Sequence, residues 1–269
     1  MRLAPTVLLC GLVFVAGCPR SPARLRLATT TSTRDTGLLD VLLPVFEKEA
    51  GVKVDVIAVG TGQALKLAEA GDVDVVLVHA RDAEDAFMAA GHGVRREDVM
   101  HNTFELLGPP ADPAGVKGVE VVEALARIAA HKAPFVSRGD DSGTHKKELA
   151  LWRDAGGLTK WEGYLETGQG MGNTLMVASE KRAYVLSDRA TYLAFKQKIE
   201  LAPFAPNSEK LNNPYGVIVV NPARHPKVDV RHANAFADFL ISERARELIS
   251  GFTVGGEQLY FPDPARSGK

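Results

Sequence analysis

Cysteine and aromatic residues are scarce in this chain of 269 residues. Of its two cysteines, Cys10 lies in a segment that we expect to be removed, so the mature chain would keep only Cys18 and form no internal disulfide. Aromatic residues make up 7%, too few to favour a sugar-stacking groove. The formal charge is only −1, and the sequence has no basic stripe of the kind that binds nucleic acid. By contrast, the apolar fraction of 45% suffices for the core of one large domain or two medium ones.

The N-terminus has the pattern of a bacterial lipoprotein signal. Arg2 is followed by a mostly apolar segment, residues 3–16, which is too short to span a bilayer comfortably. Val15-Ala16-Gly17-Cys18 resembles a lipobox, which is cleaved before a cysteine that receives lipid. We therefore expect residues 1–18 to hold the signal and lipobox, with Cys18 as the lipidated first mature residue. The mature protein would be periplasmic or at the cell surface, on a bacterial membrane only through this anchor. An ordinary signal peptide with an incidental cysteine is the alternative.

The first part of the mature chain alternates strand and helix patterns. The apolar periodicity predicts strands at residues 25–29, 52–59 and 73–78, and helices at residues 37–50, 63–70 and 82–90. This βαβαβα order predicts a parallel α/β sheet with right-handed crossovers.

A second unit is predicted to begin near Pro109-Pro110. The patterns predict helices at residues 119–131, 142–155, 172–181 and 193–198, strands at 133–136 and 183–186, a connector at 203–214, and then a strand at 215–220 and a long helix at 232–250. Since the last strand and helix could return to the first unit, we expect an α/β fold with two lobes. Lobe I would comprise residues 19–107 and 206–269, and lobe II residues 108–205. A cleft between two such lobes commonly holds a small ligand.

Two loops after predicted strands offer hydrogen-bond donors. Thr29-Thr30-Thr31-Ser32-Thr33 would place hydroxyl and amide donors at the carboxyl end of a parallel strand, where open α/β sheets bind ligands. A simple capped turn would use the same residues. Gly60-Thr61-Gly62 would let the backbone approach a ligand closely, although an ordinary turn would also use these glycines. Leu65 occupies the third glycine position of a dinucleotide fingerprint and argues against that kind of site.

The richest motif is Ser137-Arg138-Gly139-Asp140-Asp141-Ser142-Gly143-Thr144-His145, between a predicted strand and a predicted helix. The first turn of a helix has unpaired N–H groups and partial positive charge, so this motif predicts a socket for an anion. Arg138 can hold an oxyanion through two parallel N–H bonds, and Ser142 and Thr144 can donate hydroxyl protons. Asp140 or Asp141 could orient Arg138, cap the helix or accept a proton from the ligand. An exposed ion pair with Arg138 is the plain alternative. A fourth, weaker candidate is the segment 168–174, where Asn173 or Thr174 could simply cap a helix.

Catalytic and metal sites receive little support. Ser142 and His145 lie at i and i+3, which keeps an exported Ser/His hydrolase as an alternative of a different class. However, no Gly-x-Ser-x-Gly elbow surrounds any serine, and a serine at a helix start is usually a cap. The histidines are scattered without metal-ligand spacing, so no metal cation is expected. We interpret His79 as a packed or strand-end histidine and Trp152 as a core residue.

Five motifs in this order resemble the TupA-type tungstate-binding proteins of bacterial ABC importers, over essentially the whole mature chain. They are Thr29-Thr30-Thr31-Ser32, Gly60-Thr61-Gly62, the motif at 137–145, Gly170-Met171-Gly172-Asn173-Thr174-Leu175 and Tyr184-Val185-Leu186-Ser187-Asp188-Arg189.

The resemblance implies a two-lobed periplasmic binding protein fold of type II, with tungstate or molybdate held in the cleft and delivered to a membrane permease. It implies no enzymatic activity and no cofactor, and we expect a monomer. It also implies ligand contacts from Thr30, Thr31, Ser32 and Arg138, with Thr61, Ser142 and Thr144 as further candidates. The motif at 137–145 also resembles phosphate-binding proteins, because Arg138, Asp140, Ser142, Gly143 and Thr144 fit their offsets. Phosphate therefore remains the main rival ligand.

Overall fold

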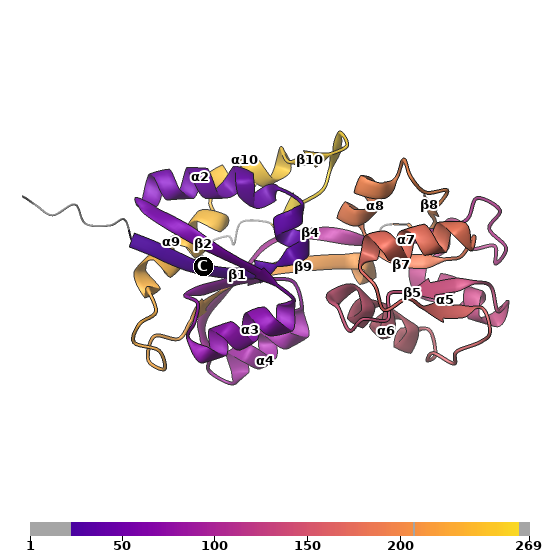
Figure 1. Ribbon diagram of the computed structural model, residues 1–269, viewed down its shortest axis with the longest axis horizontal. Helices are drawn as coiled ribbons and strands as arrows, with labels where there is room; N and C mark the ends of the chain where they lie inside the picture. The colour runs from indigo at the N-terminus through magenta and orange to yellow at the C-terminus, as the bar shows by residue number, and fades with distance from the viewer. Residues whose placement is uncertain (1–22, 207, 264–269) are drawn as a thin grey trace, which may run out of the picture.

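Two lobes lie side by side in this computed structural model, which describes residues 23–206 and 208–263 (Figure 1). The predicted lipoprotein signal, with Cys18, lies outside the described residues. Within the described ranges, the structure contains no helix with both the length and the apolar character needed to cross a membrane.

The sheet of the first lobe is mixed. Its strands follow the order β12-β4-β9-β3-β1-β2, with bounds β1 Ala23–Thr30, β2 Val52–Val59, β3 Val75–Val78, β4 Gly93–Gly108, β9 Asn212–Val220 and β12 Phe261–Pro262. The predicted parallel arrangement holds for β1, β2 and β3, but β9 is antiparallel to both β3 and β4. The reason is the path of the chain, because it leaves for the second lobe along β4 and returns along β9 (Figure 1).

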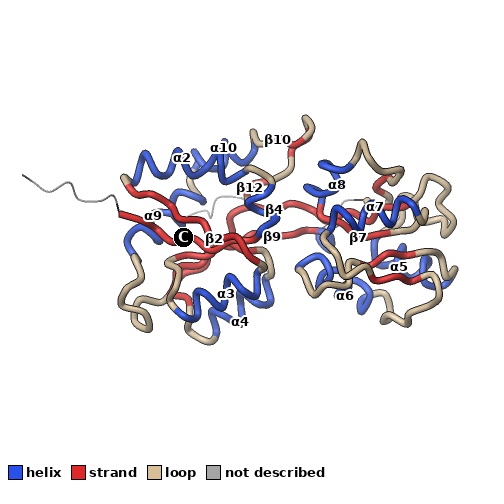
Figure 2. Tube along the Cα trace, viewed as in Figure 1, coloured by secondary structure: helices blue, strands red, loops and turns tan. Residues whose placement is uncertain are grey.

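Helices cover both faces of this sheet, as Figure 2 shows. On one side lie α2 (Leu38–Ala50), α9 (Val230–Leu240) and α10 (Glu243–Ser250), and on the other α3 (Thr61–Ala70) and α4 (Arg81–Ala89). Leu38, Leu42 and Phe46 recur every four residues and form the buried stripe of α2. The predicted long helix 232–250 is instead two helices, because the Ser242 hydroxyl accepts a hydrogen bond from the Ala245 N–H and starts α10.

The second lobe is built around the far half of β4. Here β4 pairs with β7 (Val185–Asp188) and β8 (Ala202–Pro203), while β5 (Phe135–Ser137) runs parallel to β6 (Tyr164–Glu166). A parallel bridge from Phe135 to Tyr184 connects these two groups of strands. The covering helices are α5 (Val121–Ala130), α6 (Gly143–Asp154), α7 (Met171–Glu180) and α8 (Arg189–Phe195). The ring of Phe135 lies 5.2 Å from Trp152, which is buried in this core as predicted.

Further segments differ from the sequence-based expectation, including β6, which was not predicted. The strand β4 was not predicted, yet its 16 residues pass from one lobe into the other. The helix expected at residues 193–198 begins earlier, as α8. The expected connector at 203–214 contains the end of β8, a 3-10 helix at Glu209–Leu211 and the start of β9. A short helix and a short hairpin complete the cleft region. The helix is α1 (Thr31–Asp35), and the hairpin is formed by β10 (Thr253–Val254) and β11 (Glu257–Gln258).

Candidate functional site

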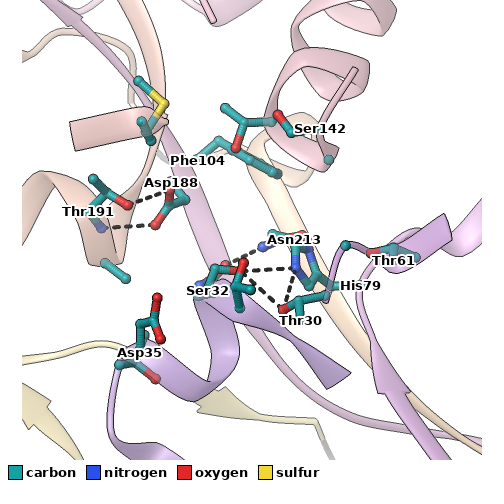
Figure 3. A pocket seen from close by; sticks show the side chains of 18 of the residues that line it. Thr30, Ser32, Asp35, Thr61, His79, Phe104, Ser142, Asp188, Thr191 and Asn213 are labelled. Carbon is teal, nitrogen blue, oxygen red and sulfur yellow. Dashed lines mark hydrogen bonds between the residues drawn. The ribbon is translucent and has the colours of Figure 1, made fainter. Parts of the chain in front are cut away.

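Six strand-to-helix turns meet at a cavity between the lobes. In the first lobe β1, β2 and β3 lead into α1, α3 and α4, and in the second β5, β6 and β7 lead into α6, α7 and α8. The strands within each set are parallel, so their carboxyl ends share one edge of the sheet. Residues from the first turn of all six helices line a cavity of about 680 Å³. Figure 3 shows part of this lining, with Thr30, Thr61, Ser142 and Asp188 facing a common space.

The helix ends around this cavity suit an anion. The first turns of five of these six helices, α1, α3, α6, α7 and α8, contain no acidic residue, whereas α4 carries Asp82 and Glu84. Acidic residues ordinarily stabilise this end of a helix, because its free N–H groups carry partial positive charge. In addition, α3 and α7 begin after Gly60 and Gly170, neither of which provides a side-chain cap. The turns thus leave backbone donors available for a negatively charged ligand.

Three members of the hydroxyl run line the cavity: Thr30, Thr31 and Ser32. Thr29 faces the sheet instead, where its hydroxyl donates to the Leu77 carbonyl at 2.8 Å. Thr30 Oγ1 accepts a hydrogen bond from the Thr33 N–H at 3.2 Å, so the capped turn is real and coexists with the lining role. Thr30 is 4% exposed, and its hydroxyl also lies 3.0 Å from Ser32 Oγ. Thr61, the first residue of α3, lines the same cavity.

Arg138 reaches this cavity from the other lobe. Its Nε donates to Asp140 Oδ2 at 2.8 Å, and Asp140 Oδ1 accepts the Ser142 N–H at 3.1 Å. Within residues 23–206 and 208–263, Asp140 is the sole hydrogen-bond partner of the guanidinium. The ion pair considered from the sequence therefore forms, and it orients Arg138 while leaving both Nη groups to donate elsewhere.

The turn that holds Arg138 depends on a glycine. Gly139 has φ +63°, and a Cβ there would lie 2.8 Å from Cβ of Glu166. Asp141 also has a positive φ, of 57°. The loop is thus held in a conformation that L side chains rarely adopt, which fixes where Arg138 emerges.

Ser142 and Thr144 both line the cavity, at the start of α6. The Ser142 hydroxyl accepts the His145 backbone N–H at 3.3 Å and is a helix cap, as its position predicted. His145 Nδ1 accepts the Asp141 N–H at 3.0 Å. The His145 imidazole is therefore held by the loop backbone, and Ser142 and His145 make no nucleophile–base hydrogen bond of the kind that activates a serine. Thr144 is 6% exposed and turned inward.

Sequence reasoning missed several lining residues, above all His79 and Asp188. His79 follows β3 directly, and Asp188 is the N-cap of α8, where its carboxylate accepts the Thr191 N–H and hydroxyl at 2.9 and 2.8 Å. Each lies at the carboxyl end of a buried strand, as the Thr29–Thr33 run does: His79 follows β3, and Asp188 is the last residue of β7. This shared position was the signal that could have identified them. Across the two described ranges, three or more His, Cys, Asp or Glu side chains nowhere cluster in a way that could hold a metal ion.

Comparison with known proteins identifies the family. Residues 19–244 match the model of the PBP superfamily domain. The tungstate-binding protein TupA of Peptoclostridium acidaminophilum is 46% identical over 245 residues, which cover 89% of this chain and 86% of that relative. The chain belongs to the TupA family of the PBP superfamily. The resemblance inferred from the five motifs is thereby confirmed.

Two further similarities agree with this assignment. A putative ABC transporter anion-binding protein of Haloferax volcanii is 51% identical over 249 residues, covering 90% of this chain and 73% of that protein. The solved structure of TupA from Desulfovibrio alaskensis G20 matches with a TM-score of 0.86 and 46% identity, covering 90% of this TupA-family chain and 99% of that one. The predicted two-lobed, type II binding-protein fold is confirmed.

Proposed function

We propose that this TupA-family protein is the substrate-binding component of an ABC importer, which captures tungstate or molybdate in the cleft and delivers it to a membrane permease. One observation carries the proposal: hydroxyls of the Thr29–Thr33 run and the guanidinium of Arg138 come from opposite lobes and line one cavity. The names of the relatives, which bind tungstate or an anion, support it as well.

The chemistry of the lining fits a tetrahedral dianion. Such an ion has four oxygens that accept hydrogen bonds and no proton to donate at neutral pH. The proposed ligand groups are all donors: Thr30, Thr31, Ser32 and Thr61 from one lobe, and Arg138, Ser142 and Thr144 from the other. Because each lobe donates, the ion would hold the lobes together and favour a closed form.

Phosphate is a weaker candidate than tungstate or molybdate. At neutral pH it carries a proton and therefore needs an acceptor, the role that Asp140 could have taken. Asp140, which the structure describes, does not line the cavity, and its two oxygens accept from Arg138 and Ser142. Asp35, Asp141 and Asp188 do line it, but each already has a partner: Asp188 accepts from Thr191, Asp35 accepts from Arg34, and Asp141 lies 3.7 Å from Nζ of Lys146. The position of Asp140 suits an orienting residue better than a ligand.

Other features of the proposal follow from the sequence and the family. We propose that residues 19–107 with 206–269 form lobe I and residues 108–205 form lobe II. We also propose that Cys18 carries a lipid anchor, that the protein works outside the cytoplasm as a monomer, and that it catalyses no reaction.

Calorimetric titration of the purified protein with tungstate, molybdate, phosphate and sulfate tests the proposal. We expect tungstate and molybdate to bind and phosphate and sulfate to bind far more weakly. Arg138→Ala should weaken tungstate binding at least about thirtyfold, since losing a desolvated charged contact costs ~2 kcal/mol or more. Arg244→Ala, in an exposed pair with Glu247 on α10, is the matched control and should bind like the unaltered protein. Unchanged affinity in Arg138→Ala, or phosphate binding as tightly as tungstate, would refute the assignment.

A further inference from the structure

A chain of hydrogen bonds lies behind the hydroxyls of Thr30 and Ser32 and ends on His79. Asn102 Nδ2 donates to the Tyr215 hydroxyl at 3.3 Å, and Asn213 Nδ2 donates to Asn102 Oδ1 at 2.7 Å. The remaining amide oxygen, Asn213 Oδ1, lies 3.0 Å from Nδ1 of His79. These residues come from β4, β9 and the end of β3, and Figure 3 shows His79 between Asn213 and the hydroxyl run.

The direction of this chain fixes the imidazole. Because Asn213 has already used its amide nitrogen as a donor to Asn102, it presents an acceptor to His79, and Nδ1 must carry the hydrogen. In the neutral ring, Nε2 is then an acceptor. Its neighbours are Thr30 Oγ1 at 3.2 Å and Ser32 Oγ at 3.5 Å. Thr30 Oγ1 also lies 2.6 Å from the hydroxyl of Thr33, which can donate to it. For Nε2 to be paired, Thr30 or Ser32 must direct its only proton at this nitrogen.

That arrangement conflicts with the proposed ligand. A deprotonated dianion accepts from every group that it contacts, so a hydroxyl whose proton is directed at His79 contributes nothing to it. If Nε2 gains a proton, it donates to Thr30 Oγ1, and the protons of both hydroxyls become available to the anion. The added positive charge also lies next to the cavity, where the α6 end of the other lobe is close: a Cβ at Gly143 would be 3.5 Å from His79 Cε1.

We propose that His79 is a positioning residue of the anion site, which takes up one proton from solvent when the dianion binds and so releases the hydroxyl protons of Thr30 and Ser32 to the ligand. This inference rests on the proposed function, because it requires an oxyanion in the cleft. It assigns a role to a side chain that the sequence analysis interpreted as a packed or strand-end histidine.

The charges around the ring agree with such a switch. Burial lowers the pKa of His79, while the Asn213 amide and the carboxylate of Asp188 raise it, so the ring is neutral in the ligand-free protein at neutral pH. Arg138 lines the same cavity from the opposite lobe, and its positive charge would disfavour a second one on His79. Tyr215 stacks on the ring at 4.6 Å, and burial raises the pKa of this tyrosine well above 10, so it adds no charge. A bound dianion would add negative charge beside the ring and raise the pKa of His79, so affinity should fall as pH rises through the value in the complex.

Calorimetric titration with molybdate in buffers of different ionisation enthalpy measures the proton directly. Between about pH 6 and 8, the range in which imidazoles titrate, we expect uptake of up to one proton per anion. The dissociation constant should rise with pH by up to about tenfold per pH unit. His79→Gln cannot protonate, so it should bind with no linked proton and with an affinity that does not change with pH. His131→Gln, on an exposed histidine after α5, is the control and should keep the uptake.

A second measurement covers the case in which His79→Gln fails to fold. Imidazole nitrogen NMR of the unaltered protein should show hydrogen on Nδ1 without anion and on both nitrogens with molybdate. A neutral ring in the complex, hydrogen on Nε2 in the free protein, or proton uptake that persists in His79→Gln would overturn the inference. If molybdate and tungstate fail to bind at all, the proposed function itself fails. Tight binding without proton uptake refutes only the role of His79.

Discussion

Glu148 should make the stability of this protein depend on pH. The side chain lies on α6 behind the Arg138 loop and is 1% exposed. Its Oε1 accepts the Tyr164 hydroxyl at 2.8 Å and the Trp152 Nε1–H at 3.3 Å. Burial raises the pKa of this carboxyl from 4.5 to about 7, because these donors only partly replace water. The folded protein therefore favours the protonated acid.

The size of the effect follows from that pKa. At about 1.4 kcal/mol per pKa unit, the rise corresponds to about 3 kcal/mol. Because the folded-state pKa is raised, the stabilisation is fully present below pH 4.5 and is lost as pH rises through about 7. Glu148→Gln keeps the shape of the protonated acid and cannot ionise. Its stability relative to the unaltered protein should therefore increase by about 3 kcal/mol between about pH 4.5 and pH 8.

Urea denaturation of both proteins at intervals across this range measures the difference. The exposed Glu162→Gln is the control for removing a carboxylate from the same lobe. The reasoning is refuted if the difference in free energy of unfolding between Glu148→Gln and the unaltered protein stays constant across this pH range. A constant difference would mean that the pKa of Glu148 is the same in the folded and unfolded protein.

Two further predictions concern the loop and the contact between lobes. Gly139→Ala should lose about 1–3 kcal/mol of stability in denaturant titrations and should bind tungstate more weakly, because residue 139 has a positive φ and lies close to Cβ of Glu166. Gly170→Ala is the control and should keep its stability, because a Cβ there meets open space. Equal losses of stability in both variants would contradict the strain argument. Glu257, on the β10–β11 hairpin of the first lobe, pairs with Arg189, the first residue of α8, at 2.7 Å and with Lys196, directly after α8, at 2.8 Å. Glu257→Gln removes partly exposed pairs worth about 0.2–1 kcal/mol each, so the ligand-free protein should show a larger radius of gyration in small-angle scattering, and an unchanged radius would exclude a latch between the lobes.

The hydrophobic pattern predicted most of the elements but not the strand that connects the lobes. Residues 95–98 of β4 read Arg-Arg-Glu-Asp, a run that resembles a solvated loop. In the fold these charges find partners: Arg96 pairs with the buried Glu84 of α4 at 2.7 Å and with Asp98 at 2.6 Å. Glu84 lies outside this run, in the preceding helix α4, and it contacts Arg96 only because α4 packs on the sheet. A local window therefore could not show that this segment tolerates burial.

The sequence predicted the loops that carry several hydrogen-bond donors. It could not predict which of these side chains face the cavity, because the fold decides their direction. Thr29 lies in a strand, in which side chains alternate between two faces, and Thr31 lies in a helix, in which they rotate by about 100° per residue. Moving the strand–helix boundary by one residue would turn a different set of hydroxyls toward the cavity, and sequence patterns locate such boundaries only to within a few residues. His79 and Asp188 follow the same logic. Each lies at the carboxyl end of a buried strand, and it becomes part of a site only because six strand ends converge.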